Sequence, residues 1–487
     1  MTVKGLKEKA VTGMFWSFSD SMATQLIQFI VGLVLARLLS PEEFGLIGMI
    51  TVFIAVTQSL VDSGFGQALI RKQEATDSDF STVFYFNFLA GVILFLVFYF
   101  SAPAIARFYA QPELTDLARV LGIIILINSA SIIQRTILIR KVSFRKLMKV
   151  NFTAAVISGA VAVTMALNGF GVWSLVWRSI TGSAVQAIML WSANRWKPKL
   201  TFNRESLRSL FSFGSKLLLS GLIDTIYRNI YLLIIGKFFS AADLGYFTRA
   251  DQFSRLASQN LTGTVQRVSY PVLSQVQEDD ERLKAGYKKL IITTMFITFF
   301  VMLGMVAVAK PMIVTLIGDK WLPSVEFLQL ICLGAMLFPL HALNLNILNV
   351  KGRSDIFLKL EVVKKLLAVP VIIAGIFLGI RAMLIGMVVL SFVAYFLNGH
   401  YSGRLVRYPV SEQIGDILPS FMAALAVSSI VFSLTLILNI SPALLLVLQL
   451  ILLAVLMVVT GRLFRLKGYM EIRSIIVEKI PKVKKFL

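Results

Sequence analysis

Two acid–base pairs lie within long apolar segments of this sequence, where charge is costly. Asp224 precedes Arg228 by four residues and Asp251 precedes Arg255 by four, an order and spacing that allow ion pairs on one helix face. A guanidinium group offers forked donors that suit phosphate oxygens, and a carboxylate can bind a proton or a sodium ion. These pairs therefore indicate either a site for an anion and a coupling ion, or mutual neutralisation inside a packed bundle.

Other charged residues share this apolar setting: the bases Arg135, Arg178, Lys216, Arg249 and Arg267, and the acids Asp20 and Asp62. Three of these bases, Arg135, Lys216 and Arg267, are close enough to segment ends to extend to the membrane surface. Within the apolar segments seven bases face four acids, a net charge of +3. This balance favours an anionic cargo over a cationic drug.

Neutral polar residues extend the charged positions into stripes along single helix faces. In residues 242–273 the stripe follows steps of three and four, which confine it to a sector of about 100°; it comprises Thr248, Asp251, Arg255, Ser258, Gln259, Thr262 and Gln266. Similar stripes are Lys216, Ser220, Asp224, Tyr227 and Tyr231, and Ser17, Asp20, Ser21, Thr24 and Gln28. We expect a polar cleft lined by Gln28, Ser220, Tyr227, Ser258, Gln259, Thr262 and Gln266.

These residues must be positioned by membrane-spanning helices. The chain is 57% hydrophobic and 15% charged, and apolar runs of about 20 residues, enough to cross the hydrocarbon layer, recur along it. We predict an all-α integral membrane protein with about fourteen spans, at 12–39, 43–70, 79–103, 114–139, 147–168, 171–193, 208–239, 242–273, 288–317, 322–349, 357–379, 381–403, 412–438 and 442–462. The alternative for 242–273 is an amphipathic helix lying on the membrane surface.

The placement of basic residues predicts the orientation. With the N-terminus in the cytoplasm, 34 of the 48 Lys and Arg fall in cytoplasmic segments and seven in outer ones, as the positive-inside rule requires. We therefore expect both termini in the cytoplasm. The excess charge then faces anionic phospholipids rather than nucleic acid.

A short pattern occurs twice, two hundred residues apart. LARLLSPEEFG (35–45) and IGKFFSAADLG (235–245) share a base, a serine, an acid and a glycine at equal spacing. The same shift carries Asp20, Thr24 and Gln28 onto Ser220, Asp224 and Arg228. Six spans separate the copies, which predicts two six-helix lobes related by a pseudo-two-fold axis along the membrane normal. The predicted parts are an N-lobe (1–199), a C-lobe (200–407), two extra helices (408–462) and a basic amphipathic tail (463–487).

The role of the tail has two possible interpretations, and so does that of two polar residues in the tenth span. Ile472, Ile475, Ile476 and Ile480 recur at helical spacing, which predicts a helix on the membrane surface or a segment that binds a partner. His341 and Asn344 share a face, where they either contact sugar or hydrogen-bond between helices.

With GMFWSFSDSMATQLIQFIVG before it and LIGMITVF after it, LARLLSPEEFG resembles the polysaccharide-transporter branch of the multidrug/oligosaccharidyl-lipid/polysaccharide exporter superfamily, and within it flippases of O-antigen, capsule and colanic-acid repeat units. The resemblance implies a protein of the bacterial cytoplasmic (inner) membrane that works by alternating access. An oligosaccharide on undecaprenyl pyrophosphate would cross this membrane for lipopolysaccharide or exopolysaccharide synthesis. It also implies polysaccharide polymerase or chain-length proteins as partners. The site residues rest on the stripes instead: Arg228 and Arg255, with Arg178 and Arg249, for the pyrophosphate, and Asp20, Asp62, Asp224 and Asp251 for a proton or sodium ion.

Other classes fit the sequence less well. A cation-coupled multidrug exporter of the same superfamily would use Asp20 and Asp224, but its branch typically has twelve spans. A major-facilitator carrier would have a basic signature where this chain has RKQEATDSD, and a scaffold would not need deep polar stripes. The chain has one cysteine, two histidines and no phosphate-binding or nucleophile motif, so we expect neither an enzyme nor a metal or other cofactor.

Overall fold

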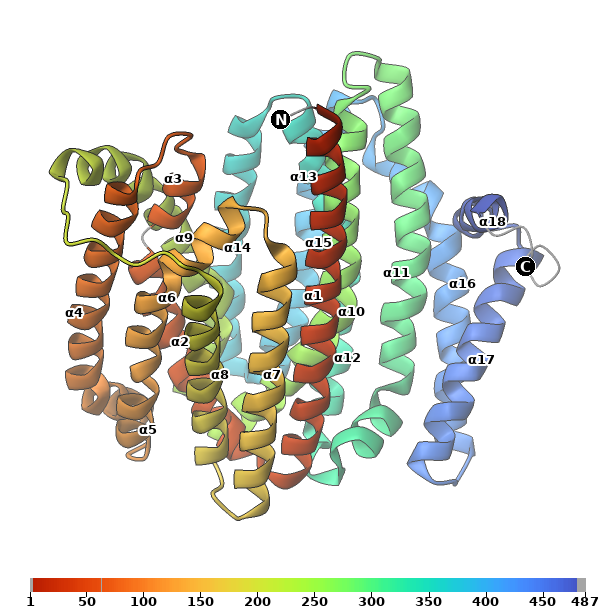
Figure 1. The fold of residues 1–487 in the computed structure, drawn as a ribbon. Coiled ribbons are helices and arrows are strands. Elements are labelled where there is room, and N and C mark those ends of the chain that lie inside the picture. Colours follow the sequence, from red (N-terminus) through yellow and green to blue (C-terminus); the bar gives the residue numbers. More distant parts are fainter. Residues whose placement is uncertain (1–2, 63, 480–487) are drawn as a thin grey trace. The chain divides into compact units, whose positions relative to one another are not determined.

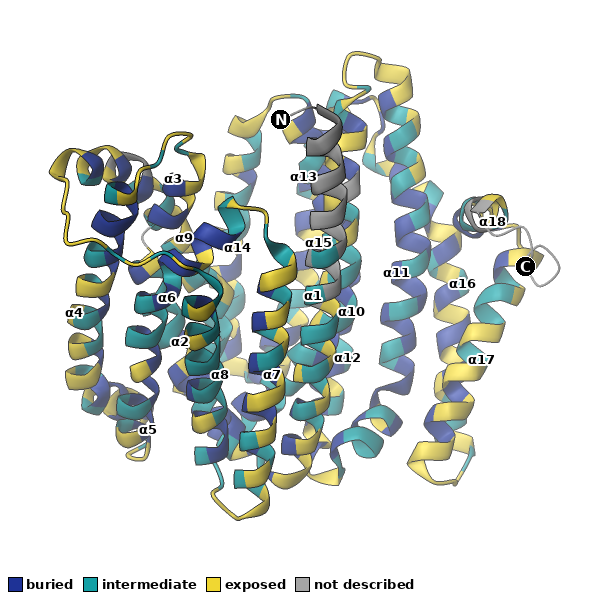
Figure 2. Ribbon diagram, in the orientation of Figure 1, coloured by how far each residue is buried: buried dark blue, intermediate teal, exposed yellow. Residues whose placement is uncertain are grey.

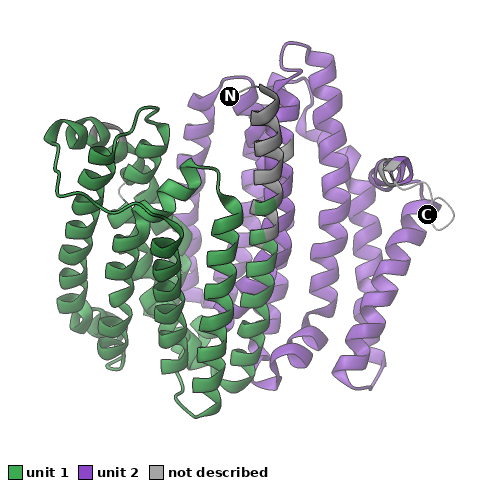
Figure 3. Cartoon of the chain, in the orientation of Figure 1, with its two compact units in different colours: residues 1–245 green, residues 246–487 purple. Residues whose placement is uncertain are grey.

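The computed structural model describes residues 3–62 and 64–479, all in helices and short connections, with no strand in these ranges (Figure 1). The chain divides into two compact units, residues 1–245 and 246–487 (Figure 3). The predicted lobe boundaries, which lie elsewhere in the sequence, stay predictions.

The first unit contains nine helices among the described residues and the start of a tenth. They are α1 (Val3–Leu38), α2 (Pro41–Asp62), α3 (Phe65–Arg71), α4 (Asp77–Tyr109), α5 (Leu114–Leu121), α6 (Ile123–Arg140), α7 (Phe144–Leu167), α8 (Trp173–Ala193) and α9 (Arg204–Phe238), followed by α10 (Ala241–Ser274), which continues into the second unit. Neighbouring helices pack as α1 with α7, α7 with α8, and α2 with α9.

The second unit is built around α11, which is buried along much of its length (Figure 2). Its elements after α10 are α11 (Asp280–Ile317), η1 (Asp319–Trp321), α12 (Pro323–Ala335), α13 (Phe338–Val350), α14 (Ser354–Leu378), α15 (Ile380–Leu405), α16 (Val410–Ile437), α17 (Pro442–Leu463) and α18 (Lys467–Lys479). Helix α11 contacts α12, α16, α17 and α18.

Each predicted span falls on a helix or on two consecutive helices. Three spans fall on two helices: the second on α2 and α3, the fourth on α5 and α6, which meet at Gly122, and the tenth on α12 and α13. Within the described residues, ten helical stretches are long and apolar enough to cross a membrane. The all-α membrane fold is therefore confirmed, whereas the count of fourteen stays a prediction, because α8, α10 and α14 carry polar or charged residues and only part of α1 is assessed.

Exposed apolar stripes show which helix faces are suited to lipid. On α17, Leu444, Leu448, Ile451, Val455 and Val459 recur at steps of three and four and are all exposed (Figure 2). A soluble surface does not carry such a continuous apolar stripe. This chain is a multi-pass membrane protein.

The tail after the last span forms the predicted helix, α18. Leu466 and Tyr469 are buried, and Lys289 of α11 forms an ion pair with Glu471 at 2.6 Å. One face of the tail thus packs on its own unit. The side chains of Ile475, Ile476 and Ile480 lie outside the described residues, so the predicted contact of this face with the membrane is not tested.

The repeated pattern forms two equivalent helix starts. Helices α1 and α9 end at Leu38 and Phe238, and α2 and α10 begin at Pro41 and Ala241, two hundred residues apart in each case. In the first turn the Ser40 backbone N–H donates to Glu43 Oε2 at 2.6 Å, and the Glu43 N–H donates to Ser40 Oγ at 3.3 Å.

The second turn repeats this arrangement with a shorter acid. The Ser240 N–H donates to Asp243 Oδ2 at 3.2 Å, and the Asp243 N–H donates to Ser240 Oγ at 3.0 Å. Both are capping boxes, which satisfy backbone donors that a helix start leaves free. The serine and acid of the sequence pattern are therefore explained by helix capping.

Candidate functional site

A polar cavity lies within the first unit, between α1, α6, α7 and α8. Its volume is about 420 Å³, and it is lined by Gln28, Ile124, Asn151, Ala154, Ala155, Ser158, Arg178, Ser179, Gly182, Ser183 and Gln186. Most of these residues carry amide, hydroxyl or guanidinium groups, an unusual content for the interior of apolar helices. The cavity is therefore the first candidate for a binding site.

Small residues let the helices around this cavity approach closely. A methyl group on Gly159 of α7 would lie 2.5 Å from Val31 Cγ2 of α1, and one on Gly182 of α8 would lie 3.5 Å from Ser158 of α7. Close approach through glycine, alanine and serine is the usual way in which membrane helices pack. It sets α1 and α8 against the two faces of α7.

Among the described residues that line the cavity, Arg178 is the one that is charged. Its guanidinium donates a long hydrogen bond of 3.5 Å to the backbone carbonyl of Gln28, and no ion pair to it occurs among the described residues. An arginine on a membrane helix that faces a polar space without a carboxylate partner favours binding of an anion. The structure thus places the predicted residues Arg178 and Gln28 together.

Asp20 lies beside the same cavity and is held by neutral donors. Its carboxylate accepts hydrogen bonds from Asn151 Nδ2 at 2.8 Å and from Thr24 Oγ1 at 3.2 Å. Asn151 also lines the cavity, so it connects Asp20 with that space. No base forms an ion pair with Asp20 within the described part of the chain.

The pair on α9 is an ion pair within one helix. Arg228 Nε lies 2.7 Å from Asp224 Oδ2, and the two side chains are 68% and 50% exposed. Ser220 is exposed and Tyr227 is half-buried on the same helix. None of these four residues lines the cavity around Arg178, which is formed by α1 and α6 to α8.

Polar side chains on α10 also form ion pairs and hydrogen bonds within their own helix. Arg255 Nε lies 2.5 Å from Asp251 Oδ2, and Arg249 Nη1 donates to Gln252 Oε1 at 2.6 Å. The hydroxyl groups of Ser258 and Thr262 donate to backbone carbonyls one turn earlier, at 2.9 and 2.7 Å, a common way to satisfy them in a helix. Gln259 and Gln266 remain exposed.

The remaining predicted acid, Asp62, is the last residue of α2. Arg135 of α6 acts on it electrostatically, so Asp62 has a basic neighbour, unlike Asp20. Among the four acids predicted to couple an ion, Asp224 and Asp251 have arginine partners on their own helix, and Asp20 has only neutral donors.

Several residues of the cavity were missed from the sequence: Asn151, Ser158, Ser179, Ser183 and Gln186. The last three follow one another at steps of four and three beside Arg178. This spacing is the same signal that identified the stripes on the other spans, and it was available in residues 171–193. Asn151 gives no such signal, because its partner Asp20 is 131 residues away.

The second unit holds a buried polar network between helices. Tyr287 of α11 donates to Asn344 Oδ1 of α13, and His341 Nε2 lies 3.2 Å from Ser391 Oγ of α15. These contacts support the interpretation of His341 and Asn344 as residues that join helices. No group of three or more His, Cys, Asp or Glu side chains that could hold a metal ion occurs in the described ranges.

Comparisons with known proteins agree with this picture. Residues 34–326 match the model of a family described as "Polysaccharide biosynthesis protein". The teichuronic acid biosynthesis protein TuaB of Bacillus subtilis (strain 168) is 27% identical over 354 residues, 72% of this chain and 73% of that protein. The lipopolysaccharide biosynthesis protein WzxC of Escherichia coli (strain K12) is 24% identical over 376 residues, 76% of each chain.

A solved structure shares the fold. The structure described as lipid II flippase MurJ in an inward closed conformation matches with a TM-score of 0.75 and 14% identity, covering 93% of this chain and 98% of that one. At this identity the likeness establishes the fold alone.

Proposed function

The chain belongs to the polysaccharide biosynthesis protein family, and from that premise we propose that it is a flippase for lipid-linked oligosaccharides. Its cargo is a sugar repeat unit on undecaprenyl pyrophosphate, which it moves across the bacterial inner membrane by alternating access. The repeat unit then serves lipopolysaccharide or exopolysaccharide synthesis. Both termini lie in the cytoplasm, as the distribution of Lys and Arg predicts.

The cavity around Arg178 is the observation that carries this proposal. A diphosphate cannot enter hydrocarbon without groups that replace its water, and the Arg178 guanidinium can donate to phosphate oxygens. The hydroxyl and amide groups of Ser179, Ser183 and Gln186 suit both phosphate and sugar hydroxyls. A site for a cationic drug would instead need an acidic lining, and no acid lines this cavity among the described residues. Asp20, which Asn151 connects with the cavity, accepts hydrogen bonds from Asn151 and Thr24.

Arg228 of the first unit, and Arg249 and Arg255 of the second, stay predicted ligands of the pyrophosphate, as the sequence indicates. The side chains of Arg228 and Asp224 are 68% and 50% exposed, so a phosphate can reach the Arg228 guanidinium and replace the carboxylate as its partner. Arg255 has the same four-residue spacing from its partner Asp251, but this pair is less exposed, at 47% for the arginine and 23% for the aspartate.

Asp20 is the acid that we assign to the coupling ion, either a proton or a sodium ion. Its partners among the described residues are neutral donors, so none of them is a fixed positive charge that would compete with the ion. Binding of the ion would change the hydrogen bonds to Asn151, and Asn151 lines the cavity. Ion binding and cargo binding would thus be linked through one side chain.

The partners in this proposal are the lipid-linked oligosaccharide, anionic phospholipids, and polymerase or chain-length proteins that take over the exported unit. Protein partners follow from the family resemblance alone. The chain's own role requires neither an enzymatic step nor a cofactor other than the coupling ion.

The test replaces Arg178 in cells whose surface polysaccharide depends on this protein. Arg178→Ala should lower surface polysaccharide by about tenfold or more, because a charge-assisted hydrogen bond contributes roughly 1.5–3 kcal/mol. Lipid-linked repeat units should accumulate inside these cells. Arg195→Ala is the matched control, since Arg195 is an exposed arginine in the segment after the same helix.

Three outcomes decide the matter. Loss of polysaccharide in Arg178→Ala, with normal protein levels and a normal control, supports the proposal. Normal export in Arg178→Ala would refute the role of the cavity. Increased drug sensitivity of a deletion strain with unchanged surface polysaccharide would favour the multidrug-exporter alternative.

A further inference from the structure

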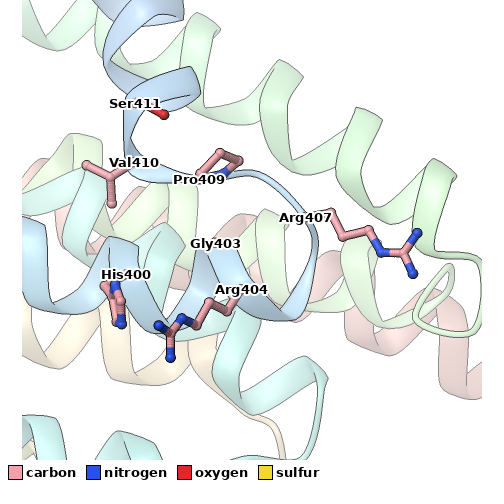
Figure 4. Close-up of a pocket in the computed structure, with 7 residues that line it drawn as sticks. All are labelled: His400, Gly403, Arg404, Arg407, Pro409, Val410 and Ser411. Atoms are coloured by element: carbon pink, nitrogen blue, oxygen red, sulfur yellow. The ribbon is translucent and has the colours of Figure 1, made fainter.

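A basic pocket lies at the turn between α15 and α16, in the second unit (Figure 4). Its volume is about 470 Å³. One side is formed by the last turns of α15, with His400 and Arg404, and the other by Pro409, Val410 and Ser411 at the start of α16. It is separate from the Arg178 cavity, which belongs to the first unit.

The pocket contains a base, Arg404, that forms no ion pair with an acid among the described residues. His400 and Arg404 are one turn apart on α15, and their side chains extend to the same side (Figure 4). Both are exposed, and no hydrogen bond or ion pair of the Arg404 guanidinium occurs among the described residues. Arg407, by contrast, directs its guanidinium away from the other two.

The nearest acid on α16 is already engaged elsewhere. Glu412 accepts from Lys284 Nζ and Lys288 Nζ of α11, both at 2.9 Å. Both bases belong to α11, so Glu412 is held by that helix. The charge of Arg404 is therefore available to an anion.

The backbone around the pocket is held in place before any ligand binds. The Tyr408 N–H donates to the Gly403 carbonyl at 2.9 Å, and Gln413 Nε2 donates to the Tyr408 carbonyl at 3.0 Å. A methyl group on Gly403 would lie 2.5 Å from the Tyr408 carbonyl oxygen, so the turn is tightly packed. The N–H groups in the first turn of α16 add a partial positive charge at the same place.

An apolar stripe leads directly to this basic pocket. On α15, Val389, Val393 and Phe396 are 55%, 39% and 51% exposed. Steps of four, three, four and four residues place His400 and Arg404 on the same face. The face is thus apolar along the membrane and basic at its end. This is the order in which a phospholipid presents its acyl chains and its phosphate.

We propose that this pocket binds the phosphodiester headgroup of an anionic phospholipid, with an acyl chain along the α15 stripe. Arg404 supplies the guanidinium for the phosphate oxygens, and His400 and Ser411 supply further hydrogen bonds. The charge distribution of the chain predicts that this turn lies on the cytoplasmic side. The proposal is independent of what the protein transports.

The test measures lipid binding to the purified full-length chain by native mass spectrometry. The detergent-solubilised protein is titrated with dioleoyl phosphatidylglycerol or dioleoyl phosphatidylcholine. Wild type should bind phosphatidylglycerol more tightly than phosphatidylcholine, and Arg404→Ala should weaken phosphatidylglycerol binding by about tenfold. Arg404→Lys should fall between the two, because lysine keeps the charge without the forked geometry.

Lys359→Ala is the matched control, because Lys359 is an exposed base of the second unit outside the pocket. It should change the phosphatidylglycerol affinity by less than about twofold. Equal affinities for wild type and Arg404→Ala, or equal losses in Arg404→Ala and Lys359→Ala, would overturn the proposal. Binding of inorganic pyrophosphate that is lost in Arg404→Ala, with no preference of the wild type for phosphatidylglycerol over phosphatidylcholine, would also overturn it, because the ligand would then be a free phosphate.

Discussion

Gly45 and Gly245 face each other's turns in a reciprocal contact within the first unit. A methyl group on Gly45 would lie 1.8 Å from the carbonyl oxygen of Ala241, and one on Gly245 would lie 1.9 Å from that of Pro41. Each glycine thus packs on the residue that begins the other's helix. The two copies of the repeated pattern therefore meet, and their glycines are the points at which they touch.

This contact predicts that an added methyl group will separate the turns. In Gly45→Ala or Gly245→Ala the backbones must move apart by more than an ångström, and overpacking of this kind costs about 1–3 kcal/mol. We expect a lower apparent melting temperature of the detergent-solubilised protein and reduced export.

Gly415→Ala is the control for this prediction. Gly415 lies in α16, and a methyl group there would have no heavy atom within 4 Å. It should leave the melting temperature unchanged or raise it slightly, since alanine favours a helix more than glycine does. A Gly45→Ala protein as stable and active as wild type would contradict the contact.

The capping boxes predict that replacing Glu43 lowers the stability of the protein more than replacing its neighbour Glu42. Glu43→Ala removes the acceptor for the Ser40 N–H and should lower stability by about 0.5–2 kcal/mol. Glu43→Gln should retain most of the stability of the wild type, because glutamine can take the same place in a capping box. Glu42→Ala is the control, as Glu42 is exposed in the same turn. Thermal unfolding of the three variants checks this, and equal effects at positions 42 and 43 would contradict it.

A third prediction concerns Asp20. In Asp20→Asn the side chain keeps an acceptor oxygen but has no negative charge with which to bind a proton or a sodium ion. We expect normal protein levels and export reduced by about tenfold or more, because the coupling step is lost. Thr24→Val removes one hydrogen bond to Asp20 and keeps the carboxylate, so it should retain most activity. Surface polysaccharide is the measurement, and full export by Asp20→Asn would exclude the coupling role.

The sequence predicts helices better than it predicts the cavity, for a physical reason. Helix ends follow from local residues such as Ser40 and Glu43, and apolar runs follow from the membrane itself. The cavity depends on contacts such as Asn151 with Asp20, which join helices distant in the sequence. Helix periodicity identifies the face that carries Arg178 but not the helices opposite it.

The same limit applies to the charged pairs on α9 and α10. Their four-residue spacing predicts the ion pairs that the structure contains. Spacing does not determine whether a pair is permanent or opens for a ligand, because both cases have the same local sequence. That distinction requires an experiment on the pair as a unit.

The last prediction separates these two cases for Asp224 and Arg228. If the two residues only neutralise each other's charge, the double variant Asp224→Asn/Arg228→Gln should regain the export that Arg228→Gln alone loses. The reason is that no unpaired charge remains in the double variant. If Arg228 binds the pyrophosphate, as we propose, the double variant should remain about as defective as Arg228→Gln, and Asp224→Asn alone should retain export. Surface polysaccharide at matched protein levels is the readout. Recovery of export in the double variant would remove Arg228 from the proposed site and leave Arg178 as its main cation.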